Sequence, residues 1–207
     1  METLPVWSPD GSSIFYLALR DDRLGFYRRA ANGAPGEQEI YRFERRDGVS
    51  LTDLSPDGRR LLFQRNGKDT VTDIWTLAVD PGAKPEVLVQ TPFQEVGAHF
   101  SRDGRWVAYR SNESGVGEIY VTAAPGSSAP AGKWLVSNGG GTGMARFRRD
   151  GREMYYLTPD GRVMAEDVTS MPTFQAGKPT RLFDVPPTFR ALFSSVTPGV
   201  LADVTPD

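Results

Sequence analysis

The chain of 207 residues contains no cysteine and a single histidine, His99. The lack of cysteine excludes disulfides, thiolate-bound zinc, iron–sulfur clusters and thiol catalysis. A metal site or proton relay that needs two imidazoles cannot be built from this chain alone. The chain also lacks an excess of either charge, because 24 Lys and Arg residues nearly balance 26 Asp and Glu residues, for a net charge of −2. We therefore expect no nucleic-acid partner.

Long hydrophobic runs are also missing, so the sequence predicts no membrane segment. No stretch shows the i, i+3, i+4, i+7 apolar spacing of an amphipathic helix. Glycine and proline are abundant, with 22 and 16 residues, and 11% of the residues are aromatic. Such a composition is typical of many short β-strands joined by turns.

A turn motif recurs four times along the chain. Ser-Pro-Asp-Gly occurs at Ser8–Gly11 and Ser55–Gly58, and variants of it occur at Ser101–Gly104 and Arg148–Gly151. Proline and aspartate suit the two central positions of a type I turn, and glycine accepts the positive φ that closes a hairpin. The predicted structural turn residues, whose aspartates are 47, 46 and 47 positions apart, are Asp10, Gly11, Asp57, Gly58, Asp103, Gly104, Asp150 and Gly151.

The residues that follow each turn are continuously apolar, which indicates strands buried on both faces. In the second and third repeats the sequence predicts four strands each. They are residues 50–54, 60–65, 73–79 and 86–90, then 96–100, 105–110, 118–123 and 134–137. Four strands in 46 or 47 residues match one blade of a β-propeller.

We therefore predict an all-β fold, a β-propeller of four-stranded antiparallel blades with about four blades plus one strand. The whole chain, 1–207, is assigned to one domain, as part of a ring of six or more blades. The predicted blades span residues 1–46, 47–92, 93–140 and 141–186, and residues 187–207 form a connection and the first strand of a further blade.

The pattern Trp-Ser-Pro-Asp-Gly, an apolar strand, then Asp/Glu-Ile-Tyr/Trp resembles the WD-repeat-like blades of TolB-type propellers. It is carried by Trp7–Gly11, by Leu54–Gly58 with Asp73–Trp75, and by Phe100–Gly104 with Glu118–Tyr120. The stretch 132–168 resembles the final blades of propellers fused to bacterial Ser/Thr kinases. Related propellers precede the catalytic domain of prolyl-oligopeptidase-type peptidases. The resemblance implies a protein or peptide partner, fusion to a kinase or hydrolase domain, and a periplasmic location.

The end of the sequence aligns with the start of another blade, because Val204 falls in the column of Trp7 and Asp207 in that of the turn aspartates. We expect the chain to be a piece of a longer propeller. Two alternatives stay open: residues 201–204 return to the first blade and close a ring of four, or a second copy completes the ring.

One column of polar residues is a candidate ligand site. The position four residues before each turn aspartate belongs to the innermost strand, which lines the channel of a propeller. This column holds Asp53, His99, Arg146 and Asp203, with Val6 in the first repeat. The residues either converge near the channel mouth or serve as solvated groups and ion pairs between blades.

Motifs of catalysis are absent from the sequence: it has no G-x-S-x-G, no kinase H-R-D or D-F-G, and no D-x-D-x-D-G calcium loop. Asp69 and Asp73 stand in one predicted loop, which we expect to be solvated. We expect no catalytic residue, cofactor or metal. The favoured hypothesis is a non-catalytic module that binds through the loops at 66–72, 91–96 and 112–117. The alternative is the substrate-gating propeller of a prolyl-oligopeptidase-type peptidase.

Overall fold

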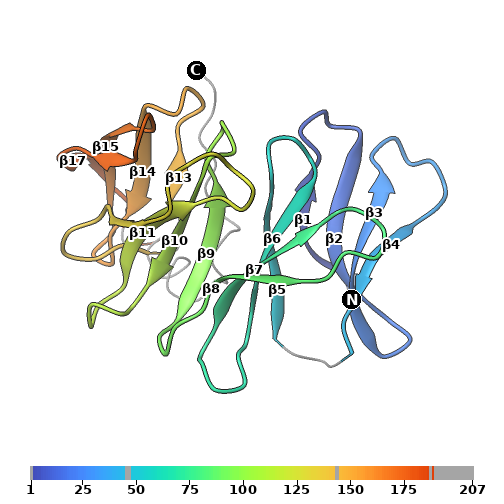
Figure 1. Cartoon of the computed structure of the whole chain (residues 1–207). Coiled ribbons are helices and arrows are strands. Elements are labelled where there is room, and N and C mark those ends of the chain that lie inside the picture. Colours follow the sequence, from blue (N-terminus) through green and yellow to red (C-terminus); the bar gives the residue numbers. More distant parts are fainter. Residues whose placement is uncertain (1, 45–47, 143–144, 187, 189–207) are drawn as a thin grey trace. The chain divides into compact units, whose positions relative to one another are not determined.

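The computed structural model describes residues 2–44, 48–142, 145–186 and 188. The strands in these residues form four antiparallel sheets (Figure 1), and the chain folds into two compact units, Met1–Pro92 and Phe93–Asp207. Each unit contains two of the sheets. The prediction of an all-β fold built from four-stranded antiparallel sheets is confirmed.

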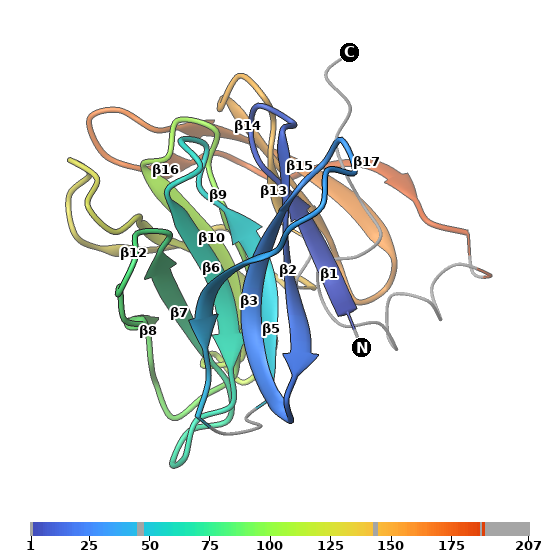
Figure 2. The ribbon, with the colours of Figure 1, turned by 90° about the vertical axis from the view of Figure 1, so that its right-hand side faces the viewer.

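The first unit contains two sheets whose strands follow one another in chain order. Figure 2 shows β1, β2 and β3 side by side in the first of them. The strands of the first sheet are β1 (Glu2–Trp7), β2 (Ser13–Arg20), β3 (Arg23–Ala30) and β4 (Gln38–Arg42). Those of the second sheet are β5 (Val49–Leu54), β6 (Arg60–Arg65), β7 (Asp73–Ala78) and β8 (Glu86–Val89).

The second unit contains one regular sheet and one with a divided edge. The regular sheet consists of β9 (Glu95–Phe100), β10 (Trp106–Ser111), β11 (Glu118–Ala123) and β12 (Lys133–Leu135). The other consists of β13 (Arg146–Phe147), β14 (Glu153–Leu157), β15 (Arg162–Thr169), β16 (Gln175–Ala176) and β17 (Thr180–Asp184). Here β17 pairs with the first half of β15 and β16 with its end, so two short strands share one edge.

The apolar second strands are buried on both faces, as their continuous apolarity predicted. Leu61, Leu62 and Phe63 of β6 have no exposed surface, and the same holds for Trp106 and Val107 of β10. A sheet cannot bury an apolar face by itself and needs a second layer against it. One face of β6 therefore packs against the first sheet, and one face of β10 packs against the fourth sheet.

Each unit has its own core between its two sheets. In the first unit the core is rich in phenylalanine, and Phe26 makes edge-to-face contacts with Phe43 and Phe63 at ring-centroid distances of 5.2 and 5.1 Å. In the second unit Trp106 contacts Trp134 and Phe174 at 5.1 and 5.6 Å. Such aromatic packing fixes the spacing of the sheets and holds their loops in place.

Candidate functional site

The predicted channel column lies on the first strand of each sheet. Asp53 of β5 pairs with Leu62, and His99 of β9 pairs with Ala108. His99 is buried and Asp53 is half-buried. The carboxylate of Asp53 accepts a hydrogen bond from the amide of Leu54 at 2.8 Å, so part of its hydrogen-bonding capacity is used by its own strand.

Arg146 occupies the same column on β13, opposite Tyr155, and donates to the carbonyl of Ala145 at 3.0 Å. Asp53 belongs to the first unit, whereas His99 and Arg146 belong to the second. Asp203 lies outside the described residues. Convergence of the column on one point therefore stays a prediction.

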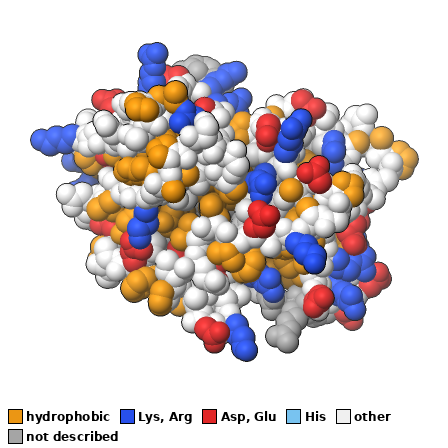
Figure 3. Space-filling view, in the orientation of Figure 1, with side chains coloured by type: hydrophobic (Ala, Val, Ile, Leu, Met, Phe, Trp, Pro, Cys, Tyr) orange, Lys and Arg blue, Asp and Glu red, His pale blue; other side chains and the backbone are white. Residues whose placement is uncertain are grey.

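Metal and membrane sites give no further candidate in the part of the chain that the structure describes. No group of three or more His, Asp or Glu residues there is arranged to hold a metal ion. No helix among these residues is long and apolar enough to cross a membrane. In the space-filling view, basic and acidic side chains are interspersed on the visible face (Figure 3).

The repeated motifs form tight turns between the first and second strands of each sheet. In all four, the amide of the glycine donates to the carbonyl of the residue three positions earlier, at 2.8–2.9 Å, and the glycine φ is +69° to +73°. In the first turn the carboxylate of Asp10 accepts hydrogen bonds from Ser8 and Ser12, which lower the pKa of Asp10 to about 2. These carboxylates hold their own turns, which is a structural role.

A fifth turn of this type was missed in the sequence. Thr158–Gly161, Thr-Pro-Asp-Gly, joins β14 to β15, and the amide of Gly161 donates to the carbonyl of Thr158 at 2.9 Å. The hydrogen bond from Thr158 lowers the pKa of Asp160. The signal was visible in the sequence, but the turn stands between the second and third strands and so falls outside the 47-residue spacing.

The third strands of the second and third sheets each begin with a buried carboxylate. Asp73, the first residue of β7, is fully buried instead of lying in a solvated loop as expected. Its Oδ2 accepts hydrogen bonds from Thr70 at 2.8 Å and from Gln90 at 2.9 Å. Asp73 therefore joins the loop before β7 to the connection after β8.

Glu118, the first residue of β11, has the equivalent place in the third sheet. Its Oε1 accepts hydrogen bonds from the amides of Gly139 and Gly140 at 3.1 and 3.0 Å, and its Oε2 accepts one from Ser137. The hydroxyl of Ser137 in turn accepts the amide of Ile119 at 2.7 Å. Asp73 and Glu118 both belong to the motif that predicted the fold, but no pattern in the sequence assigned them this role.

Hydrogen bonds link the connections of the third sheet that lie before β9, between β10 and β11, and after β12. The amide of Gln94 donates to Asn112 at 2.8 Å, which joins the connection before β9 to the loop between β10 and β11. Arg110 donates to the side chain of Gln94 at 3.3 Å and to the carbonyl of Gly141 at 3.1 Å. Burial lowers the pKa of Arg110. The guanidinium of Arg110 thus links two connections, and the Gln94–Asn112 hydrogen bond links one of them to the loop between β10 and β11.

These same two loops expose apolar side chains. Phe93, next to Gln94, is 41% exposed, and Val116 in the loop between β10 and β11 is 55% exposed. Glu113, in the same loop as Val116, forms an ion pair with Lys133 of β12 at 2.5 Å, and the Lys133 ammonium lies 5.3 Å from the centre of the Tyr120 ring. We define Phe93, Glu113, Val116 and Lys133 as the loop-end surface of the second unit.

The side chains beneath this surface are packed and hydrogen-bonded. Tyr109 stacks on Tyr120 with ring centroids 6.0 Å apart, and burial raises the pKa of Tyr109. Ser111 donates to Glu95 at 3.1 Å. This arrangement supports a rigid surface that carries exposed apolar groups and both signs of charge, which is the chemistry of a binding surface.

Comparison with known proteins agrees with the sheet geometry. No protein-family model matches the chain. An uncharacterized protein of Agrobacterium fabrum is 29% identical over 110 residues, which are 53% of this chain and 36% of that protein. TolB from Acinetobacter baumannii superposes with a TM-score of 0.68 at 18% identity, over 89% of this chain and 44% of that one.

Two further solved structures resemble the chain. A protein assigned as TolB from Agrobacterium tumefaciens gives a TM-score of 0.66 at 18% identity, over 86% of this chain and 64% of that one. A structure of prolyl endopeptidases gives a TM-score of 0.55 at 15% identity, over 89% of this chain and 30% of that one. The chain spans less than two thirds of the length of each of these proteins.

The four-stranded antiparallel sheets and these similarities define the chain as built of β-propeller blades. More particularly, these blades superpose on those of the two TolB structures, so the chain shares the β-propeller fold of those proteins. At these identities the similarity shows the fold, and function must be argued from the surface.

Proposed function

We propose that this chain is a non-catalytic propeller module that binds a protein or peptide partner through the loop-end surface of its second unit. The module would serve a larger bacterial sensor, signalling or TolB-like protein, as its resemblance to kinase-fused propellers suggests. The observation that carries the proposal is the exposure of Phe93 and Val116 on loops that Gln94, Asn112 and Arg110 hold in place.

A rigid surface supports binding because its side chains lose little further conformational entropy when a partner docks. An exposed phenyl ring and a valine supply apolar contact area, and the Glu113–Lys133 pair supplies polar contacts at the rim. An extended or loop-shaped peptide with apolar anchors fits this chemistry best, since the surface has no field of one charge sign.

The non-catalytic part of the proposal rests on how the titratable groups are used. General acid–base chemistry needs two such groups aimed at a shared open space. Glu118 is instead surrounded by hydrogen bonds from its own connection, and Glu113 pairs with Lys133. These carboxylates organise the loops.

A peptide library displayed on phage and panned on the immobilised chain tests the proposal. We expect enriched peptides with apolar anchors to bind the wild-type chain and to lose at least about tenfold in affinity with Phe93→Asp/Val116→Asp. Leu182→Asp on β17 is the matched control, because Leu182 is 49% exposed in the same unit but lies on an edge strand. Peptides that bind the wild-type chain and the double variant equally would refute the loop-end assignment.

A second function is favoured by the similarity to prolyl endopeptidases. In that case the chain is the propeller that filters substrates for a peptidase domain. The coding sequence that follows Asp207 distinguishes the two functions. An α/β-hydrolase segment with G-x-S-x-G supports the gating role, and a kinase or TolB-like segment beside the chain supports the sensor role.

A further inference from the structure

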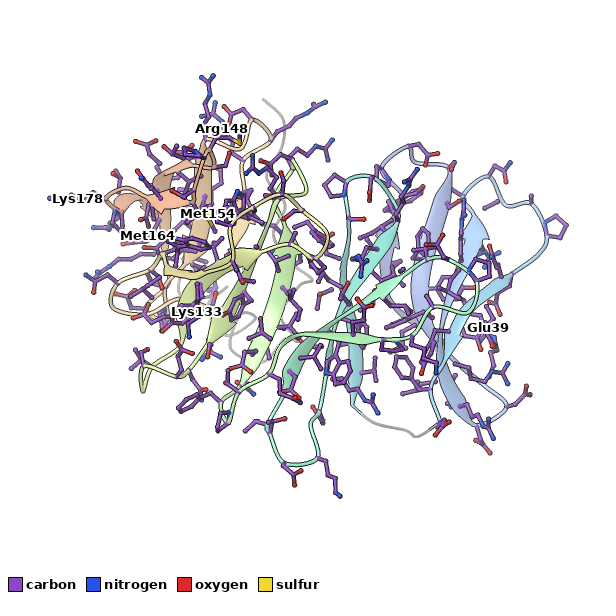
Figure 4. All side chains as sticks on the ribbon, viewed as in Figure 1. Glu39, Lys133, Arg148, Met154, Met164 and Lys178 are labelled. Carbon is purple, nitrogen blue, oxygen red and sulfur yellow. The ribbon has the colours of Figure 1, made fainter. Side chains whose placement is uncertain are left out.

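Glu166 is a buried carboxyl on the face of β15 that also carries Met164 and Val168, which pack in the core of the second unit. It lies on β15 directly opposite Met154 of β14, and only 2% of its surface is exposed. Met154, Met164 and Val168 pack in the core between the third and fourth sheets, and Figure 4 shows both methionines on the strands of the fourth sheet. One oxygen of Glu166, Oε2, is buried without a hydrogen-bond partner.

The groups around Glu166 do not compensate a negative charge. Burial raises the pKa of Glu166 to about 7. On β14, Tyr156 has a pKa raised to about 12, by burial first and then by the charges of Glu166 and of Glu118 on β11. On β10, the guanidinium of Arg110 donates to Gly141 and Gln94. An ionised carboxylate here would therefore lack the partners that buried charges require.

We propose that Glu166 is a proton-dependent latch between the third and fourth sheets: the neutral acid packs within their interface, and the ionised carboxylate favours its opening. This goes beyond the proposed binding function, because it concerns the interface between the sheets and not the loop-end surface. It makes the packing of the second unit respond to pH in the range near neutrality.

The direction of the response follows from linkage. A carboxyl whose pKa is higher in the folded chain than in the unfolded chain stabilises the fold fully below the unfolded pKa, near 4.5, and loses that contribution as pH rises towards 7. The equilibrium constant for unfolding of the second unit should rise about tenfold per pH unit between about pH 5 and 6.5 and level off above about pH 7.5. The turn aspartates Asp10 and Asp57, whose pKa values are lowered, act only at more acidic pH.

Tryptophan fluorescence can measure this in the full chain. Of the four tryptophans, Trp106 and Trp134 lie at or against the core of the second unit, so a Trp7→Phe/Trp75→Phe background reports on that unit. Urea unfolding from pH 5 to 8 should show the rise in the unfolding constant with Glu166, and Glu166→Gln should remove it. Glu153→Gln, on the neighbouring strand β14, is the control and should keep the wild-type pH profile.

Parallel pH profiles for the background and Glu166→Gln would overturn the proposal. A second measurement does not depend on the variant folding: the ¹³Cδ resonance of Glu166 in the native chain, identified by selective labelling. A titration midpoint near 7 supports the latch, and a midpoint near 4.5 refutes it. Neither measurement uses a peptide ligand, so the latch and the loop-end surface fail independently.

Discussion

The second and third sheets begin their third strands with a carboxylate, but they fix it in different ways. Asp73 gives one oxygen to two side-chain donors, Thr70 and Gln90, while its buried Oδ1 has no partner. Glu118 uses both oxygens, and two of its donors are backbone amides. The repeat thus keeps the position of the carboxylate and its link to the connection after the fourth strand, but not its partners.

The difference follows from the length of the side chain and the composition of the connection. Glutamate is one methylene longer than aspartate, and the glycines at 139 and 140, with φ of +90° and +108°, let the backbone turn its amides towards it. The connection after β8 offers instead the long side chain of Gln90. A side-chain donor costs rotamer entropy to fix, so the link at Asp73 should be the weaker of the two.

The largest expected effect is that of Glu118→Ala. It leaves the buried hydroxyl of Ser137 and the buried amide of Gly140 without their acceptor, and it also removes the acceptor of the more exposed amide of Gly139. We expect the free energy of unfolding to fall by about 3 kcal/mol, measured by urea unfolding followed through Trp106 and Trp134.

The control is Glu113→Ala, which removes a partly exposed ion pair and should cost no more than about 0.5 kcal/mol. Equal losses for the two variants would mean that Glu118 does no more than a surface carboxylate.

Asp73→Ala should cost less, about 2 kcal/mol, because only two side-chain donors lose their acceptor and both can turn towards water. Trp75, two residues along β7, provides the fluorescence signal for the first unit. The exposed Asp69 gives the control Asp69→Ala, which should stay within about 0.5 kcal/mol of the wild type. A larger loss for Asp73→Ala than for Glu118→Ala would reverse the comparison.

The sequence predicted the fold well because the repeat has a local physical cause. The turn glycines need positive φ, and the apolar strands need burial on both faces, so four copies of the pattern determine the sheets. For β6 the predicted and observed bounds are the same, Arg60–Arg65, and for β11 they are Glu118–Ala123. The divided edge of β16 and β17 was not predicted, since it depends on how a long β15 is shared by two short partners.

The candidate sites were harder to predict because they depend on contacts between distant residues. Asp53, His99 and Arg146 could be placed in one column by counting, but counting does not show what a side chain contacts. Glu166 could have been noticed in the sequence. It stands two residues from both Met164 and Val168, so on a strand this charged side chain lies on the same face as these two apolar ones. The partners of Glu118 lie far along the chain, beyond the reach of strand periodicity.

The turns before the second strands also differ between the third and fourth sheets. The hydroxyl of Ser101 donates to Asp103 at 2.5 Å and accepts the amide of Trp106 at 2.9 Å, so it links both sides of its turn. The fourth turn has Arg148 at this place, and its guanidinium makes a surface contact with Glu153 at 3.3 Å. The fourth turn therefore lacks the two links that a serine hydroxyl supplies.

The smallest expected effects come from exchanging these features. We expect Ser101→Ala to lower the free energy of unfolding by about 1.5 kcal/mol, because it removes both links in a partly buried turn. Arg148→Ser should raise it by about 0.5 kcal/mol, because serine there restores both links at the expense of a weak ion pair. Urea unfolding of the two variants beside the wild type measures both changes, and a loss of stability in Arg148→Ser would show that the arginine contacts outweigh the missing hydroxyl.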